Sequence, residues 1–251
     1  MNTIVIIPAY NEEGKISQVV QGIKNCNHGL ITEILVVDDA STDRTSTEAR
    51  AAGATVISHR NNHGAGAAIR TGIIYAMKKG YDACVLMGGD DQDDPSEIDR
   101  LFEPIIKDGY DLVQGSRYLN QQRTINMPPF RYITTKMYTT FFRLVSRFPV
   151  TDASNGFRAL RLSIFKRIDI WQENLGRYDL EPFLFLQAIK NGLRVKEVPV
   201  TKKFDLEKGY SKMKPVVSWY SICKPLLKEL YWNGRKKAVQ TRKLPANERI
   251  R

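Results

Sequence analysis

Short apolar runs that alternate with helix-spaced segments are the feature that most constrains the fold of this 251-residue chain. Continuous apolar runs bounded by turn residues are typical of buried strands. Such runs occupy residues 3–7, 33–37, 55–57, 83–87, 111–114 and 194–198. Helical spacing marks residues 12–25, 41–52, 65–79, 96–107, 128–148, 177–191 and 215–232. This alternation predicts a mostly parallel sheet with right-handed crossovers.

The strand predicted at 83–87 runs directly into two glycines and four carboxylates within residues 88–95. Open α/β sheets bind ligands beyond the carboxyl ends of their strands, so these carboxylates stand where a ligand is expected. Hard oxygen donors suit Mg²⁺ or Mn²⁺, which usually accompany phosphate-bearing substrates. The alternative is a solvated acidic turn in which Asp94, before Pro95, caps the next helix. This segment alone leaves both interpretations open.

Composition indicates the class of protein and its compartment. The chain is 42% hydrophobic and 26% charged, which is typical of a globular protein with a full core. Its three cysteines are far apart and lack metal-ligand spacing, so we interpret them as reduced thiols in a cytosolic setting. The first residues do not resemble a signal peptide, and no run of about 18 apolar residues predicts a membrane span.

The net charge of +11 is concentrated in one part of the chain. Residues 201–251 contain 14 Lys and Arg against 4 Asp and Glu, whereas residues 1–200 contain 24 against 23. This basic segment indicates an anionic surface or partner, such as phospholipid headgroups, a phosphorylated substrate or nucleic acid. We expect no nucleic acid, because no recognisable binding module is present. For residues 236–251, a solvated and flexible tail is the simpler interpretation.

Two helical segments combine apolar and basic side chains. Residues 128–148 carry aromatic and aliphatic residues at helical spacing, with Arg and Lys at the other positions. Residues 214–235 place Trp and Tyr beside lysines. Helices of this composition can lie in a membrane interface. An ordinary core-facing helix is the alternative, which we prefer for residues 128–148.

Four polar segments follow predicted strands and should therefore gather at one edge of the sheet, at residues 8–13, 38–43, 88–95 and 114–118. In order and spacing they resemble family 2 of the inverting nucleotide-sugar glycosyltransferases, and within it the polyprenyl-phosphate (dolichol-phosphate) mannose and glucose synthases. The resemblance covers about residues 2–213. It implies the A-type glycosyltransferase fold, a Rossmann-like, mostly parallel α/β sheet with helices on both faces. The expected division is a catalytic domain at 1–213, an amphipathic, membrane-surface helix at 214–235 and a basic tail at 236–251.

The resemblance implies a binding site for a nucleotide-sugar donor. Pro8, Tyr10 and Glu12 would line the nucleoside pocket. Asp39 would bind the base or ribose, because a carboxylate accepts hydrogen bonds and can read an N–H or a hydroxyl. Asp38 would instead shape the turn.

A glycine-rich segment at residues 63–72 resembles the family's glycine loop, in which Gly64 would bring the backbone close to the nucleotide. In isolation its G-x-G-x-x-A pattern also fits a dinucleotide-binding fingerprint. That fingerprint belongs after the first strand of such a fold, whereas this segment follows the third. We therefore prefer the glycine-loop interpretation.

The acidic run departs from the family pattern at one position. Asp90 aligns with the family's second metal-binding aspartate and Gln92 with its glutamine beside the diphosphate, but Gly88 stands in place of the first aspartate. Asp90, phosphate oxygens and Gln92 or a water would then hold Mg²⁺ or Mn²⁺, an ion that often uses only one or two carboxylates. We expect weak metal affinity before the donor binds, and turn or cap roles for the other three carboxylates.

A phosphate-bearing lipid acceptor requires cations. The resemblance assigns Arg117 and Arg131 to the acceptor phosphate, with Thr135 one turn beyond Arg131. Segments 155–158 and 209–213 resemble the family's Ser-Gly-Phe-Arg and Gly-x-Ser-Lys-Leu. The arginine usual before the second segment is replaced here by lysines, which lack a bidentate fork. The lysines assigned to the phosphate are Lys203, Lys208 and Lys212.

The sequence thus predicts an inverting transfer of a hexose from a GDP-mannose or UDP-glucose type donor to a polyprenyl phosphate, with Asp90, Gln92 and Arg117 as catalytic residues. A phosphate acceptor is already anionic and needs no strong base. Asp152 and Glu181 are the only candidate bases for a hydroxyl acceptor, and neither is persuasive. The alternatives are transfer to a saccharide hydroxyl and a non-catalytic, membrane-associated homologue. We expect the protein on the cytoplasmic face of a membrane, peripheral to an anionic surface or a membrane-protein partner.

Overall fold

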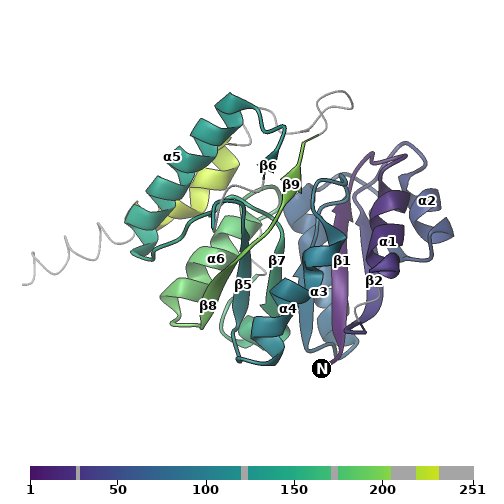
Figure 1. Cartoon of the computed structure of the whole chain (residues 1–251), viewed down its shortest axis with the longest axis horizontal. Coiled ribbons are helices and arrows are strands. Elements are labelled where there is room, and N and C mark those ends of the chain that lie inside the picture. The colour runs from purple at the N-terminus through teal and green to yellow at the C-terminus, as the bar shows by residue number, and fades with distance from the viewer. Residues whose placement is uncertain (27–28, 120–123, 171–174, 205–218, 232–251) are drawn as a thin grey trace, which may run out of the picture.

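A computed structural model describes residues 1–26, 29–119, 124–170, 175–204 and 219–231 (Figure 1). Its centre is a seven-stranded sheet in the order β3-β2-β1-β4-β7-β5-β8. All neighbouring strands are parallel except at β7, which runs against β4 and β5. The strands of this sheet are β1 (Thr3–Ala9), β2 (Ile31–Asp38), β3 (Thr55–Ser58), β4 (Ala83–Leu86), β5 (Leu112–Ser116), β7 (Arg158–Arg161) and β8 (Val195–Pro199). The predicted mostly parallel α/β architecture is confirmed.

Helices cover both faces of the sheet, and each predicted helix is present over the residues that the structure describes. They are α1 (Ile16–Asn25), α2 (Thr45–Ala51), α3 (Ala65–Lys78), α4 (Ile98–Ile106), α5 (Pro129–Ser146), α6 (Leu180–Lys190) and a helix over residues 219–231. Two 3₁₀ turns, η1 (Pro95–Glu97) and η2 (Leu162–Lys166), and a small parallel pair, β6 (Thr124–Ile125) with β9 (Lys202–Lys203), complete the described elements. None of the described helices is both long and apolar enough to span a bilayer.

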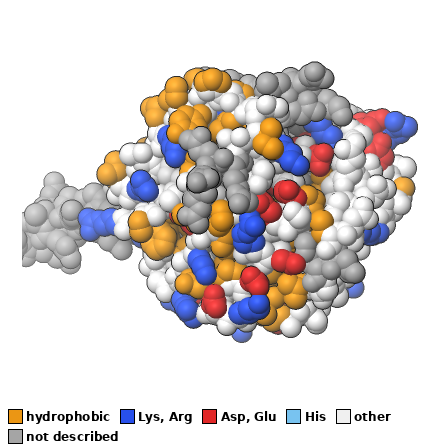
Figure 2. All heavy atoms as spheres, in the orientation of Figure 1, with side chains coloured by type: hydrophobic (Ala, Val, Ile, Leu, Met, Phe, Trp, Pro, Cys, Tyr) orange, Lys and Arg blue, Asp and Glu red, His pale blue; other side chains and the backbone are white. Residues whose placement is uncertain are grey.

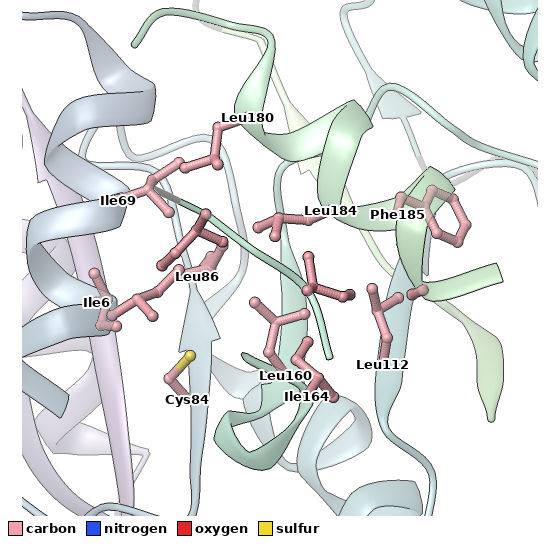
Figure 3. Close-up of a cluster of buried hydrophobic side chains, with 14 of the residues drawn as sticks. Ile6, Ile69, Cys84, Leu86, Leu112, Leu160, Ile164, Leu180, Leu184 and Phe185 are labelled. Carbon is pink, nitrogen blue, oxygen red and sulfur yellow. The ribbon is translucent and has the colours of Figure 1, made fainter. Parts of the chain in front are cut away.

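The central strands read as continuous apolar runs because both of their faces are buried. Along β1, Ile4 and Ile6 pack into the cluster beneath α3 and α6, whereas Val5 and Ile7 pack into the cluster beneath α1 and α4. Figure 3 shows the first cluster, in which Ile6 and helical side chains converge on β4. These two cores fix the strand ends, and therefore the loops beyond them.

The antiparallel strand β7 is a feature that the sequence analysis missed. It lies between β4 and β5, with Arg158 opposite both Leu86 and Gln114. Because β7 begins where its two neighbours end, the segment that precedes it reaches the carboxyl edge of the sheet. The sequence motif at 155–158 is therefore delivered to the same edge as the four polar segments.

Helix α5 presents apolar side chains on two faces. Tyr138 and Phe142 are buried, and Tyr138 packs against Trp219 of the neighbouring helix at a ring distance of 6.2 Å. The preferred interpretation of a core-facing helix therefore describes only one side of α5. The exposed apolar side chains of α5 are Phe130, Ile133, Met137 and Leu144. The proposed division at 214–235 stays a prediction, and the tail at 236–251 lies outside the described residues.

Candidate active site

A cavity of about 590 Å³ opens at the carboxyl edge of the sheet. Side chains from all four polar segments line it, as their positions after β1, β2, β4 and β5 predict. The predicted site residues in its wall are Pro8, Tyr10, Glu12, Asp39, Gly64, Asp90, Gln92, Arg117 and Arg131. Thr135 and Lys203 do not line it, and Lys208 and Lys212 lie outside the described residues. The predicted residues that line the cavity thus share one location, and the role of each of them stays a prediction.

The end of β2 supplies two aspartates with different surroundings. Asp38 shapes the turn as predicted, because its carboxylate accepts hydrogen bonds from the Ser41 amide (3.0 Å) and the Ser46 hydroxyl (2.9 Å). Asp39 faces the cavity and is 2% exposed. Its Oδ2 accepts from the Gly64 amide at 2.7 Å, so this carboxylate also anchors the glycine loop.

The glycine loop packs closely against the segment that enters α6. The amides of Gly66 and Ala67 donate to the carbonyls of Arg177 (2.7 Å) and Gly176 (2.9 Å). Gly64 has φ +94°, and a Cβ on it would lie 2.7 Å from the Gly176 carbonyl oxygen. A side chain at this position would therefore break the contact between the two segments. The first amides of α3 bind the protein's own backbone in this arrangement.

The acidic run separates into residues with distinct contacts. Asp90 lines the cavity and its Oδ1 accepts from the Gln92 amide at 3.3 Å. Asp93 is buried, with Oδ1 2.8 Å from the Lys202 ammonium and Oδ2 accepting from the Gly88 amide at 3.2 Å. Asp94 accepts from the amide of the residue after Pro95 at 3.0 Å, which confirms its predicted cap role.

These contacts decide how a divalent cation would fit. Among the described residues, no three Asp, Glu, His or Cys side chains converge as a metal cage. Asp93 is already engaged by Lys202, and Gly88 has no side chain to offer. Asp90 and Asp93 both line the cavity, and Asp90 is the one of the two that is not paired with Lys202. One carboxylate together with substrate phosphates suits Mg²⁺ or Mn²⁺, which retain waters and seldom need an all-protein cage.

Arg117 and Asp152 form a buried, bidentate ion pair in the cavity wall. Arg117 Nε and Nη2 lie 2.6 and 2.9 Å from the two carboxylate oxygens. Burial alone would raise the pKa of Asp152, but the charge and hydrogen bonds of Arg117 outweigh it and hold that pKa below its usual value. Glu197 braces the same turn by accepting from the Thr151 and Asp152 amides. Asp152 is thus a structural partner of Arg117 and is poorly suited to act as a base.

The other predicted acceptor residues are distributed unevenly. Arg131 lines the cavity and its guanidinium lies 5.1 Å from the ring of Phe204. Thr135 is buried, and its hydroxyl lies 2.7 Å from the Tyr118 hydroxyl. Successive residues of a strand point to opposite sides, so β9 directs Lys202 toward the cavity and leaves Lys203 exposed.

Arg158 and Glu181 also line the cavity, although neither was assigned a binding role from the sequence. Arg158 is 1% exposed, and its guanidinium donates to the carbonyls of Glu181 (2.9 Å) and Asn155 (2.5 Å). Burial lowers the pKa of this guanidinium. Arg158 belongs to the motif at 155–158, so the family resemblance carried the signal that could have identified it.

Comparison with known proteins is consistent with this geometry. The family described as Glycosyl transferase family 2 matches residues 4–169. The polyprenol monophosphomannose synthase of Mycolicibacterium smegmatis is 31% identical over 93% of this chain and 87% of its own length. The UDP-N-acetylglucosamine–dolichyl-phosphate N-acetylglucosaminyltransferase of Methanococcus voltae is 32% identical over 78% of this chain and 83% of its own.

Among solved structures, glucosyl-3-phosphoglycerate synthase from Mycobacterium tuberculosis, crystallised with Mn²⁺, UDP and phosphoglyceric acid, has a TM-score of 0.69 at 19% identity. The match covers 92% of this chain and 78% of that one, and it supports the fold. The fold is that of an A-type glycosyltransferase. The chain belongs to glycosyltransferase family 2.

Proposed function

We propose that this glycosyltransferase moves a hexose, with inversion, from a nucleotide-diphosphate sugar to a polyprenyl phosphate. The observation that carries the proposal is that one cavity is lined by both carboxylates and cations. Asp39 and Asp90 are among the carboxylates, and Arg131 and Lys202 are among the cations. The names of the two relatives, which describe transfer to polyprenol and dolichyl phosphates, support a lipid phosphate as the acceptor.

The reaction follows from the positions of these side chains. The loops after β1 and β2 would hold the nucleoside, and Asp90 would hold the diphosphate end of the donor through a Mg²⁺ or Mn²⁺ ion. That ion, when bound, neutralises charge on the leaving diphosphate. Arg131 and Lys202 would orient the acceptor phosphate so that its oxygen attacks the anomeric carbon from the face opposite the leaving group. Catalysis would therefore come mainly from positioning the two substrates and from stabilising the charge that develops in the transition state.

Of the two candidate bases, Asp152 is bound to Arg117, which leaves Glu181 for a hydroxyl acceptor. A phosphomonoester attacks without losing a proton to a strong base and would need neither residue. Glu181 lines the cavity with a side chain 22% exposed and is the residue that a hydroxyl acceptor would need. The Glu181→Gln variant therefore separates the two functions. With a phosphate acceptor kcat should stay within about threefold of the wild type, and with a hydroxyl acceptor general-base loss should lower it by about 10²–10⁴-fold.

The deciding assay offers GDP-mannose, UDP-glucose and UDP-N-acetylglucosamine, with Mg²⁺ or Mn²⁺, to a short-chain polyprenyl phosphate and to soluble saccharides. Formation of a polyprenyl phosphate hexose that depends on Asp90 supports the proposal. Transfer only to a saccharide favours the hydroxyl alternative. The absence of transfer with every donor, or full activity in Asp90→Ala, favours a non-catalytic homologue.

We further propose that the protein works at the surface of a membrane, on its cytoplasmic face. Hydrophobic side chains gather over α5 in Figure 2, with Lys and Arg at the margin. Exposed apolar residues also lie on the neighbouring helix, where Tyr220 is 65% and Tyr231 61% exposed. An apolar patch bordered by cations suits acyl chains and anionic headgroups. A membrane-protein partner for the same patch is the alternative.

A further inference from the structure

His59 connects the nucleotide side of the cavity to α3, although it does not line the cavity itself. Its Nδ1 lies 2.8 Å from Asp39 Oδ1, and its Nε2 lies 2.9 Å from the Thr71 hydroxyl. The backbone amide of His59 donates to the Asp38 carbonyl at 2.8 Å. His59 is thus fixed by hydrogen bonds at both ring nitrogens and at its backbone amide.

The chemistry of the partners fixes the hydrogens of this imidazole. An ionised carboxylate can only accept, so Nδ1 carries the hydrogen that points at Asp39. In the neutral ring Nε2 then accepts from Thr71. The side chains of His59 and Asp39 are only 14% and 3% exposed, so little water competes for these contacts.

Asp39 has almost no acceptor capacity left for a ligand. A carboxylate offers about four lone-pair positions, two on each oxygen. Oδ1 accepts from His59 and from the His63 amide at 3.0 Å, and Oδ2 accepts from the Gly64 amide. One position, on Oδ2, remains for a group bound in the cavity.

We infer that His59 is a positioning residue for the donor site. By occupying Oδ1 it holds the Asp39 carboxylate so that a single acceptor position, on Oδ2, reads one N–H or O–H of the donor nucleoside. This inference rests on the proposed function, because it requires that a nucleotide binds on this side of the cavity. His59 would influence donor affinity from outside the cavity, because it fixes the orientation of the Asp39 carboxylate before the donor binds.

Two isosteric variants separate the two ends of the imidazole. His59→Asn keeps an N–H near the position of Nδ1, and His59→Gln keeps a polar group near Nε2 but loses the contact with Asp39. Isothermal titration of UDP and GDP gives the dissociation constant without turnover, and steady-state kinetics give the donor KM, the acceptor KM and kcat. Tyr75→Phe is the matched control, since it removes a hydrogen bond from the same helix α3 to Glu33 at the opposite end of β2.

We expect His59→Gln to weaken nucleotide binding and raise the donor KM by about tenfold, the effect of one lost hydrogen bond. The acceptor KM and kcat should stay within about twofold, and His59→Asn should recover most of the affinity, as expected when binding and not chemistry is affected. Equal nucleotide affinity in the wild type and in His59→Gln would overturn the inference. So would a parallel loss of affinity and melting temperature in all His59 variants, which would indicate a purely structural role.

The same titration distinguishes failure of this inference from failure of the proposed function. If the wild type binds neither UDP nor GDP, the proposed function is wrong and this inference is overturned with it. If nucleotide binding is normal and only the acceptor differs from a polyprenyl phosphate, the comparison of His59→Gln with His59→Asn still decides the role of His59.

Discussion

Arg117 and Asp152 neutralise each other inside the wall of the cavity at the carboxyl edge of the sheet, through two hydrogen bonds between a guanidinium 2% exposed and a fully buried carboxylate. The pair joins the end of β5 to the segment before β7. Any charge that Arg117 offers to a substrate is therefore already shared with a residue of the protein.

Removing one partner of this pair should destabilise the fold strongly. Asp152→Asn leaves the Arg117 guanidinium buried without its counter-charge, and we expect the free energy of unfolding to fall by about 3–5 kcal/mol. Urea unfolding at neutral pH measures the loss. The control is Asp108→Asn, which breaks an exposed pair with Lys196 and should cost under about 1 kcal/mol. Equal losses in the two variants would contradict this account.

The same pair predicts how stability depends on pH. The pKa of Asp152 is lowered in the folded state, so its ionised form stabilises the fold. That contribution is fully present above the unfolded pKa of about 4 and is lost as the pH falls through the lower folded value. The difference in unfolding free energy between the wild type and Asp152→Asn should be constant from pH 7 to pH 5 and shrink in strong acid. A difference that grows below pH 4 would have the wrong sign.

Gly88 offers a direct test of the metal site. A Cβ at this position would lie 2.9 Å from Asp90 Oδ1, an atom at the end of a movable side chain. Gly88→Asp should therefore place a second carboxylate beside the first and tighten Mn²⁺ binding, without donor, by at least about tenfold. Gly88→Asn is the neutral control. Indistinguishable Mn²⁺ affinities for the two variants would show that the added carboxylate does not reach the ion.

The exposed side of α5 predicts the effect of charge on membrane binding. Ile133→Glu combined with Met137→Glu should lower binding to anionic phospholipid vesicles by more than about tenfold, because each apolar side chain buried in lipid contributes about 1.5–3 kcal/mol. Co-sedimentation measures this. Met77→Glu changes an exposed methionine on α3 and should leave vesicle binding unchanged. Retained binding in the double variant would exclude α5 as the contact.

The contact between the glycine loop and the segment before α6 can be tested at Gly64. Gly64→Ala adds both backbone strain and a clash with the Gly176 carbonyl, and should lower the unfolding free energy by about 2–4 kcal/mol while weakening nucleotide binding. Gly80→Ala has a similar φ of +76° but open space around it, so it isolates the strain alone. Thermal unfolding and UDP titration compare them. Equal effects on nucleotide binding would remove the contact from the explanation.

Much of the fold could be predicted from the sequence because its central strands are buried on both faces. A run such as residues 4–7 has no polar interruption, and the polar residues after it mark the carboxyl edge. The strand β7 could not be found in this way, since its four residues begin and end with arginine. Arg158 is nevertheless buried, and its guanidinium donates to the carbonyl of Asn155 just before β7 and to that of Glu181 in α6.

The location of the site could be predicted from the sequence more readily than the contacts within it. The four polar segments converge because strand order places them together. The pairing of Arg117 with Asp152 spans 35 residues, and the choice of Lys202 over Lys203 depends on a two-residue strand; neither leaves a periodic pattern. The apolar positions of α5 divide between a buried and an exposed side, a division that helical spacing alone does not reveal.

The reversed direction of β7 carries the segment before it to the edge of the sheet at which β1, β2, β4 and β5 end. The cavity wall therefore combines the turns after β1, β2 and β4 with later segments that include residues 153–156 and Lys202. The early and late segments touch directly, since Lys202 pairs with Asp93 and the Lys203 amide donates to the Gln92 carbonyl. A substitution around β9 therefore acts on the acidic run as well, so these two parts of the wall are constrained to evolve together.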